Sequence, residues 1–169
     1  FTNWKYGEFD NSLPFIYGMD FGVNDPDTLV KVAIDKKQKT IYVSEEVYQN
    51  GLSTDSLFEL VKSKVIGRSL IVADSAANRT ILDLRNKGLN IVACSKRKIT
   101  EDIKAIKSYT IVVTENSYNL ASELNSWVWL DKNGEVPLDD HNHAIDPIRY
   151  AFNKLTQAAP TGMKVAKHG

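Results

Sequence analysis

Hydrophobic and polar residues alternate along the first part of the chain in the manner of β-strands. Apolar side chains recur at every second position over residues 28–34 and 40–48, and the largely apolar stretch 15–20 precedes them. Short polar segments with turn-forming residues, 24–27 and 35–39, separate the three. We therefore predict an antiparallel meander of three strands.

From residue 53 onward, helical periodicity alternates with short apolar runs. We predict helices capped by Ser53 or Thr54, from Asn78 to Gly88, over 99–109, around Leu120 and Leu124, and over 148–155; strands are predicted at 69–73, 89–94, 110–113 and 127–130. Strands that alternate with helices are typical of parallel pairing. The predicted fold class is α/β, with three antiparallel strands followed by parallel strands in one mixed sheet flanked by helices.

Composition and charge limit the function classes. The chain has 169 residues, 43% of them hydrophobic, and equal numbers of basic and acidic residues, 21 each. One domain core is expected, and a net charge of zero excludes a histone-like protein, so any nucleic-acid contact requires a local basic patch. The single cysteine, Cys94, cannot form an internal disulfide, which favours a reducing cytoplasm. No apolar run approaches the roughly 18–20 residues that cross a bilayer, and we expect no membrane association.

Three acids lie where strands or a helix would place them near one another. Asp20 shares a strand face with Gly18 and Gly22, which leaves space around its carboxylate. Asp74 follows the buried strand 69–73, at the carboxyl end where open α/β sheets bind ligands. Asp146 follows three residues after His143, on the same face if the segment is helical.

Convergence of these acids would require protons or cations. Two carboxylates about 4 Å apart repel by about 4 kcal/mol at an effective dielectric constant near 20. Oxygen ligands with one imidazole favour Mg²⁺ or Mn²⁺, and the sequence has no competing cysteine–histidine framework. Two such ions can hold the attacking and leaving oxygens of a phosphodiester.

Each of these residues also has a purely structural interpretation. Asp74 could cap a helix, Asp20 could form a turn, and His143 could cap or pack. The other loop acids, which we expect to be solvated, are Asp25, Asp27, Asp139 and Asp140. The order and placement of the acids, rather than any one of them, favour a shared site.

The three motifs together resemble the C-terminal nuclease domain of the large terminase subunit of tailed bacteriophages. They are Tyr17-Gly18-Met19-Asp20-Phe21-Gly22, Ala73-Asp74-Ser75-Ala76, and Asn142-His143-Ala144-Ile145-Asp146 with Arg149-Tyr150-Ala151, within a resemblance that covers about residues 15 to 155. The resemblance implies an RNase H-like fold and a metal-dependent endonuclease that cuts concatemeric viral DNA into genome-length units.

The resemblance also implies roles for individual residues. Asp20, Asp74 and Asp146 would bind two divalent cations, Mg²⁺ or Mn²⁺, and His143 would be an accessory ligand or proton-transfer group. The candidates for binding DNA phosphates are Lys96, Arg97, Lys98, Lys104 and Lys107. Implied partners are double-stranded DNA, the ATPase motor domain of the same full-length chain, the small terminase subunit and the portal, in the cytoplasm of an infected bacterial host.

Two positions depart from the family pattern. Ala77 and Asn78 stand where the family often has a further acid, so no fourth carboxylate is expected there. Pro147 follows Asp146, where alanine is common, so we expect the last helix to begin near Pro147 with His143 on the preceding turn.

The predicted domain organisation has three parts. Residues 1–14 form an N-terminal linker or extension, 15–157 the nuclease domain and 158–169 a flexible tail. Because the sequence has no Gly-x-x-x-x-Gly-Lys-Ser/Thr motif and begins with Phe1, we expect a nuclease domain from a longer protein that does not itself hydrolyse ATP.

Two alternative functions stay open. A Holliday-junction-resolvase-like nuclease would need an acid on the third strand, such as Glu45 or Glu46. A non-catalytic packaging or docking module would use the acids only as helix caps.

Overall fold

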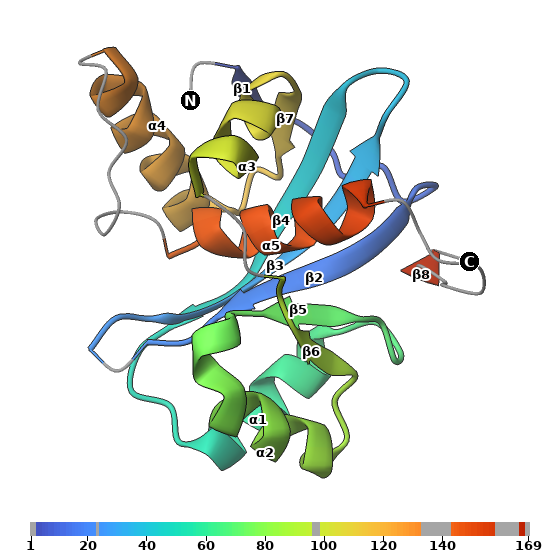
Figure 1. Ribbon diagram of the computed structural model, residues 1–169, viewed down its shortest axis with the longest axis vertical. Helices are drawn as coiled ribbons and strands as arrows, with labels where there is room; N and C mark the ends of the chain where they lie inside the picture. Colours follow the sequence, from blue (N-terminus) through green and yellow to red (C-terminus); the bar gives the residue numbers. More distant parts are fainter. Residues whose placement is uncertain (1–2, 23, 96–98, 133–142, 158–165, 168–169) are drawn as a thin grey trace.

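The predicted elements form one mixed sheet with helices on both faces (Figure 1). A computed structural model describes residues 3–22, 24–95, 99–132, 143–157 and 166–167. The strands are β1 (Trp4–Tyr6), β2 (Pro14–Asp20), β3 (Asp27–Asp35), β4 (Thr40–Gln49), β5 (Ile71–Ala73), β6 (Ile91–Ala93), β7 (Thr110–Val113) and β8 (Ala166–Lys167). The helices are α1 (Thr54–Lys64), the 3₁₀ turn η1 (Ser75–Ala77), α2 (Asn78–Lys87), α3 (Ile99–Lys107), α4 (Tyr118–Lys132) and α5 (Ile145–Thr156).

The topology confirms the predicted fold class. The strand order is β1-β7-β4-β3-β2-β5-β6, with β8 also paired to β2. The meander β2–β3–β4 is antiparallel, whereas β5, β6, β7 and β1 pair in parallel. Because β5 lies directly beside β2, the ends of the first predicted strand and of the first parallel strand are neighbours.

The period-two pattern of β2 divides its side chains between two cores. Phe15 and Tyr17 pack with α1 and α2, while Ile16 packs with α3, α4 and α5. In Figure 1 the first two helices lie on one side of the sheet, and α5 crosses the strands on the other side. Asp20 has the same parity as Ile16, so its strand directs it to the α5 side.

Two parts of the sequence analysis differ from the structure. The predicted strand at 127–130 is wrong, because these residues belong to α4. The spacing of Leu120, Leu124 and Trp127 continues a helical pattern, and no helix-breaking residue occurs before residue 133. Strand β1 was not predicted: it has only three residues and pairs in parallel with β7, Trp4 opposite Ile111.

Parts of both predicted terminal segments take part in the sheet. Residues 4–6 form β1, and Ala166 pairs with Phe15 of β2. The boundaries at residues 14 and 157 stay predictions. Within the described part of the chain, no helix is both long and apolar enough to cross a membrane.

Candidate functional site

Two of the three acids lie level with each other on adjacent strands. In the parallel pair β2–β5, Gly18 is opposite Val72 and Met19 is opposite Ala73. The next residues along the two strands are Asp20, which ends β2, and Asp74, which follows β5. The sheet register therefore places both at the carboxyl ends of neighbouring strands.

The third acid approaches from α5, and a glycine allows it to do so. A Cβ atom on Gly18 would lie 1.8 Å from the carbonyl oxygen of Pro147. Backbone contact this close is possible only without a side chain at position 18. Asp146, the residue before Pro147, is thereby held over the end of β2, close to Asp20.

Helix α5 begins two residues earlier than Pro147. It starts at Ile145, so Asp146 and Pro147 are in its first turn, and His143 precedes it as predicted. Proline is tolerated there because the first N–H groups of a helix have no partner within the helix.

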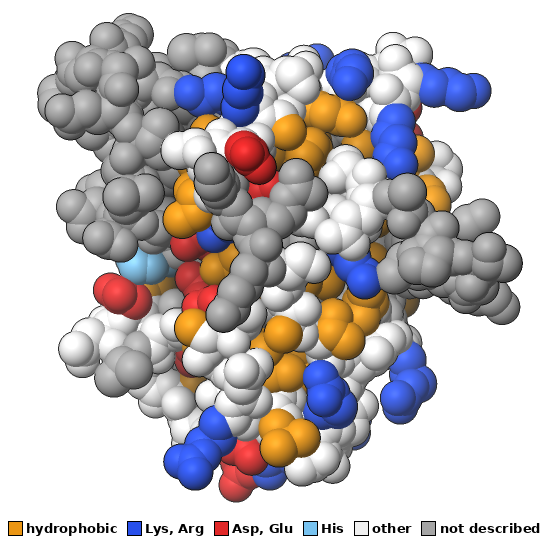
Figure 2. Space-filling model, viewed as in Figure 1, with side chains coloured by type: hydrophobic (Ala, Val, Ile, Leu, Met, Phe, Trp, Pro, Cys, Tyr) orange, Lys and Arg blue, Asp and Glu red, His pale blue; other side chains and the backbone are white. Residues whose placement is uncertain are grey.

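The electrostatics show that the three acids share one environment. Burial, followed by the charges of Asp146 and Asp74, raises the pKa of Asp20 from 3.8 to about 7. The pKa of Asp146 is also raised, mainly by burial. The Arg149 cation opposes this rise, and the charge of Asp74 adds to it. Figure 2 shows acidic side chains gathered beside a histidine on one face of the molecule. Mutual repulsion among partly buried carboxylates is the condition under which a bound cation becomes favourable.

The carboxylates are not drawn together as a preformed chelate. Oδ1 of Asp20 accepts a hydrogen bond from the Phe21 N–H at 3.0 Å, and Oδ1 of Asp74 accepts one from the Ala76 N–H at 3.0 Å. The residues that the structure describes contain no group of three or more His, Cys, Asp or Glu side chains arranged to hold a metal ion. The donor set still fits Mg²⁺ or Mn²⁺, because these hard cations prefer oxygen ligands and the hydrogen bonds to Asp20 and Asp74 engage only one oxygen of each carboxylate.

The remaining predicted site residues are less closely associated with the acids. His143 lies beside Asp25, with Nε2 3.8 Å from Oδ1, and its ring contacts Tyr48. It is also near enough to Asp146 to lower the pKa of that carboxyl. Lys104 and Lys107 are exposed on α3, whereas residues 96–98 lie outside the described residues.

The sequence analysis missed a buried charged network behind the site. Arg149 lies 3.5 Å from both Asp102 Oδ2 and Asp146 Oδ1, through Nη1 and Nη2 respectively. Asn153 donates to Asp102 Oδ1 at 3.3 Å. The sequence does contain a sign of this network. Asp102 lies three residues after Ile99 and next to Ile103, which places an acid on the apolar face of a predicted helix.

Two further buried acids were also missed. Glu123 accepts hydrogen bonds from the Ala144 and Ile145 N–H groups, at 2.9 and 3.3 Å, and so caps α5. Burial raises its pKa from 4.5 to about 7. The prediction that Asp27 is solvated is wrong: it is 6% exposed and accepts from the Gly22 N–H at 3.0 Å, which closes the loop after β2. Asp139 and Asp140 lie outside the described residues.

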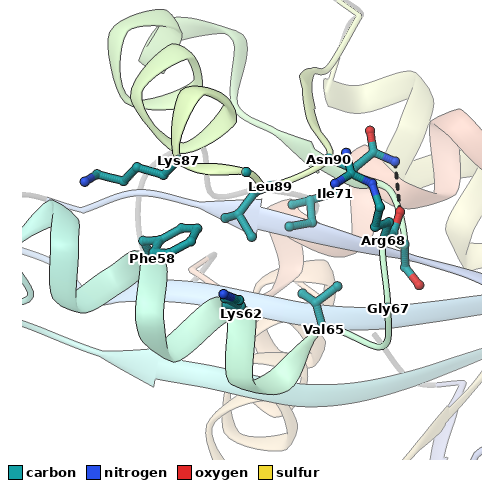
Figure 3. A pocket seen from close by; sticks show the side chains of 11 residues that line it. Phe58, Lys62, Val65, Gly67, Arg68, Ile71, Lys87, Leu89 and Asn90 are labelled. Carbon is teal, nitrogen blue, oxygen red and sulfur yellow. Dashed lines mark hydrogen bonds between the residues drawn. The ribbon is translucent and has the colours of Figure 1, made fainter.

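Two hollows differ in their relation to the acids. One of about 370 Å³ adjoins Asp74 and is lined also by Phe21, Asp27, Leu57 and Thr80. The other, of about 260 Å³, lies at the amino ends of β5 and β6, with Lys62, Arg68 and Lys87 around apolar side chains (Figure 3). Of these two hollows, the first is lined by the carboxylates of Asp74 and Asp27, whereas no carboxylate lines the second.

Comparison with known proteins identifies the family. Residues 20–154 match the family model described as the terminase RNase H-like domain. The chain belongs to this family. It is 30% identical to the PBSX phage terminase large subunit of Bacillus subtilis (strain 168) over 149 residues. This alignment covers 82% of this chain and 34% of that protein. It is 28% identical over 164 residues to the terminase large subunit of Bacillus phage SPP1, covering 90% and 38% respectively.

A solved structure supports the same assignment and confirms the RNase H-like fold. The nuclease domain of the SPP1 large terminase, crystallised with bound Mn, matches with a TM-score of 0.78 and 26% identity over 92% of this chain and 98% of that one. This terminase RNase H-like domain thus spans little more than a third of the curated relatives, but nearly all of that nuclease domain.

Proposed function

We propose that this domain is a metal-dependent endonuclease that cuts concatemeric viral DNA during genome packaging. The observation that carries the proposal is the placement of Asp20 and Asp74 at the carboxyl ends of adjacent strands, with Asp146 of α5 near enough for its charge to act on the Asp20 carboxyl. The Mn bound to the similar SPP1 nuclease domain supports the same conclusion.

Each acid has a distinct task in this scheme. Asp20, whose carboxyl is affected by the charges of both other acids, would contribute to holding two cations, with Asp74 holding one and Asp146 the other. Bound cations would supply activation of a water molecule and stabilisation of the leaving 3′ oxygen. His143, beside Asp146, would accept or donate a proton at Nε2, where it now faces Asp25.

The surface around the acids suits a DNA backbone. The hollow beside Asp74 leaves that carboxylate accessible, and Lys104 and Lys107 are exposed on α3. Lysines bind phosphate without reading bases, so we expect weak sequence preference and strong salt dependence. Residues 96–98 complete this proposed phosphate-binding set.

The biological setting follows from the family. Large terminase relatives are about three times as long as the matched segment, so we propose that an ATPase motor domain belongs to the same full-length protein. The small terminase subunit and the portal are the proposed further partners, in the cytoplasm of an infected bacterium.

The alternatives fit the geometry less well. Of the two acids that could serve in the resolvase interpretation, Glu45 accepts hydrogen bonds from the Leu120 N–H at 2.7 Å and from Asn119, so its carboxylate is committed to the start of α4. Glu46 lies near Tyr17, whose side chain packs with α1 and α2. The docking interpretation has one supporting contact, because Asp74 does cap η1. That contact explains Asp74 alone and does not account for the mutual repulsion of the partly buried Asp20 and Asp146.

Plasmid nicking tests the proposal. Asp20→Asn should reduce Mn²⁺-dependent nicking by at least about a hundredfold while the protein stays folded. Asp83→Asn, the same change at an exposed position of α2, is the matched control and should nick normally. Asp74→Ser keeps a capping oxygen for Ala76 but removes the charge, so it should also be inactive. Full activity of Asp20→Asn, or nicking in excess chelator, would reject the nuclease.

A further inference from the structure

The guanidinium of Arg149 is shared between two carboxylates that have different surroundings. Asp146 belongs to the proposed cation site, whereas Asp102 is on α3, behind it, with a side chain that is 5% exposed. Both carboxylates lie 3.5 Å from Arg149 nitrogens, longer than a good charge-assisted hydrogen bond. Arg149 is therefore in position to move closer to either acid.

This sharing has a consequence for cation binding. A cation at Asp146 and the Arg149 cation compete for the same carboxylate. Asp102 offsets the charge of Arg149, and Asn153 fixes Asp102 by donating to its other oxygen. Without the charge of Asp102, Asp146 would be the carboxylate left within ion-pair distance of Arg149, whose side chain is 11% exposed.

We propose that Asp102 is a positioning residue, which holds Arg149 toward α3 and thereby keeps the Asp146 carboxylate available for a divalent cation. The proposal rests on the proposed function, because it assigns Asp146 to the cation site. It also links that site to α3, the helix that bears Lys104 and Lys107, so the phosphate-binding and cation-binding parts are fixed to each other.

Mn²⁺ affinity of the folded protein is the decisive measurement. Free Mn²⁺ is counted by electron paramagnetic resonance in titrations of the wild type, Asp102→Asn, Arg149→Met and the double variant. Asp102→Asn should bind Mn²⁺ about tenfold more weakly. In the Arg149→Met background the same substitution should change the affinity little, because the competing cation is gone.

This cycle separates the proposal from simpler explanations. If Asp102 acted only by its own charge on the cation, Asp102→Asn would weaken binding equally in both backgrounds, which would overturn the proposal. If it acted only in stability, the unfolding temperature would fall without a change in Mn²⁺ affinity. A wild type that binds no Mn²⁺, or binds it equally well as Asp20→Asn, would instead contradict the nuclease itself.

A second measurement covers the case in which Arg149→Met fails to fold. In a crystal structure of Asp102→Asn, the distance from Arg149 Nη2 to Asp146 Oδ1 should shorten to about 2.8 Å. An unchanged Arg149 would overturn the proposal. Unfolding of Asp102→Asn in chelator would also overturn it, since Asp146 must be able to hold Arg149 alone.

Discussion

The helices on the two faces of the sheet are fixed by different kinds of contact. On the α1–α2 face, the first turn of α1 is capped by its own neighbour Ser53, and α2 ends at Gly88. On the opposite face, α4 and α5 are capped by carboxylates from other elements, Glu45 of β4 and Glu123 of α4. On the first face the helix caps come from neighbouring residues in the sequence. On the second face the caps form only when the chain has folded, because they join residues far apart in the sequence.

The candidate site lies on the second face. Its acids come from β2, the end of β5 and α5, and the network behind them joins α3 to α5. Buried acids are tolerated there because each has hydrogen-bond donors or a cation beside it. The face on which charged groups from distant elements meet therefore depends most on the complete fold, and it is also the face that we propose binds ions.

The largest expected effect comes from removing the close approach that brings α5 to β2. In Gly18→Ala the new Cβ would overlap the Pro147 carbonyl, so α5 must move. We expect the free energy of unfolding to fall by about 3 kcal/mol or more, with loss of Mn²⁺ binding. Urea unfolding and Mn²⁺ titration measure the two effects.

A control separates packing from backbone strain. Gly67 has φ 57° and open space where a Cβ would be added, so Gly67→Ala should cost only about 1 kcal/mol and leave Mn²⁺ affinity unchanged. Equal costs at positions 18 and 67 would show that the contact between Gly18 and Pro147 is not what holds α5.

The next effect is a dependence of stability on pH without metal. The folded-state pKa values of Asp20 and Glu123 are both about 7, above their ordinary 3.8 and 4.5. The folded protein therefore binds more protons than the unfolded chain between about pH 4 and 7. In chelator, the free energy of unfolding should fall by roughly 2–4 kcal/mol as the pH rises through this range.

Variants test whether this pH dependence of the free energy of unfolding comes from the acids on the α3–α5 side of the sheet. Asp20→Asn and Glu123→Gln should each flatten it, whereas Asp83→Asn, on the α1–α2 face, should not. A stability that rises steadily from pH 4 to 7 would contradict the burial of these two carboxyls in the absence of metal.

The same difference between faces explains what the sequence could predict. The alternation in β2 is enough to place Asp20 and Gly18 on one face, and the sequence offers Ser53 or Thr54 as the cap of α1, of which the structure shows Ser53, with its partner three residues away. The Gly18–Pro147 contact and the pairs that Asp102 forms with Arg149 and Asn153 join residues far apart in the chain, so no local pattern contains them.

Buried acids were the main source of wrong or missing predictions. Asp27 stands in a turn-rich segment that is typical of solvated loops, and only the folded loop shows its carboxylate accepting from Gly22. Glu123 was overlooked between Leu120 and Leu124, although an acid on the apolar face of a helix is a signal for a buried partner.

The smallest effect tests the local face itself. Ser53 accepts a hydrogen bond from the Ser56 N–H at 3.1 Å at the exposed start of α1, so Ser53→Ala should lower the free energy of unfolding by about 1 kcal/mol. Mn²⁺ affinity should be unchanged, because the proposed cation ligands belong to other elements.

Glu45→Ala removes a cap on the opposite face and should lower the free energy of unfolding more than Ser53→Ala does, since the start of α4 is partly buried there. A larger loss from Ser53→Ala than from Glu45→Ala, by urea unfolding, would contradict the division between locally and remotely capped faces.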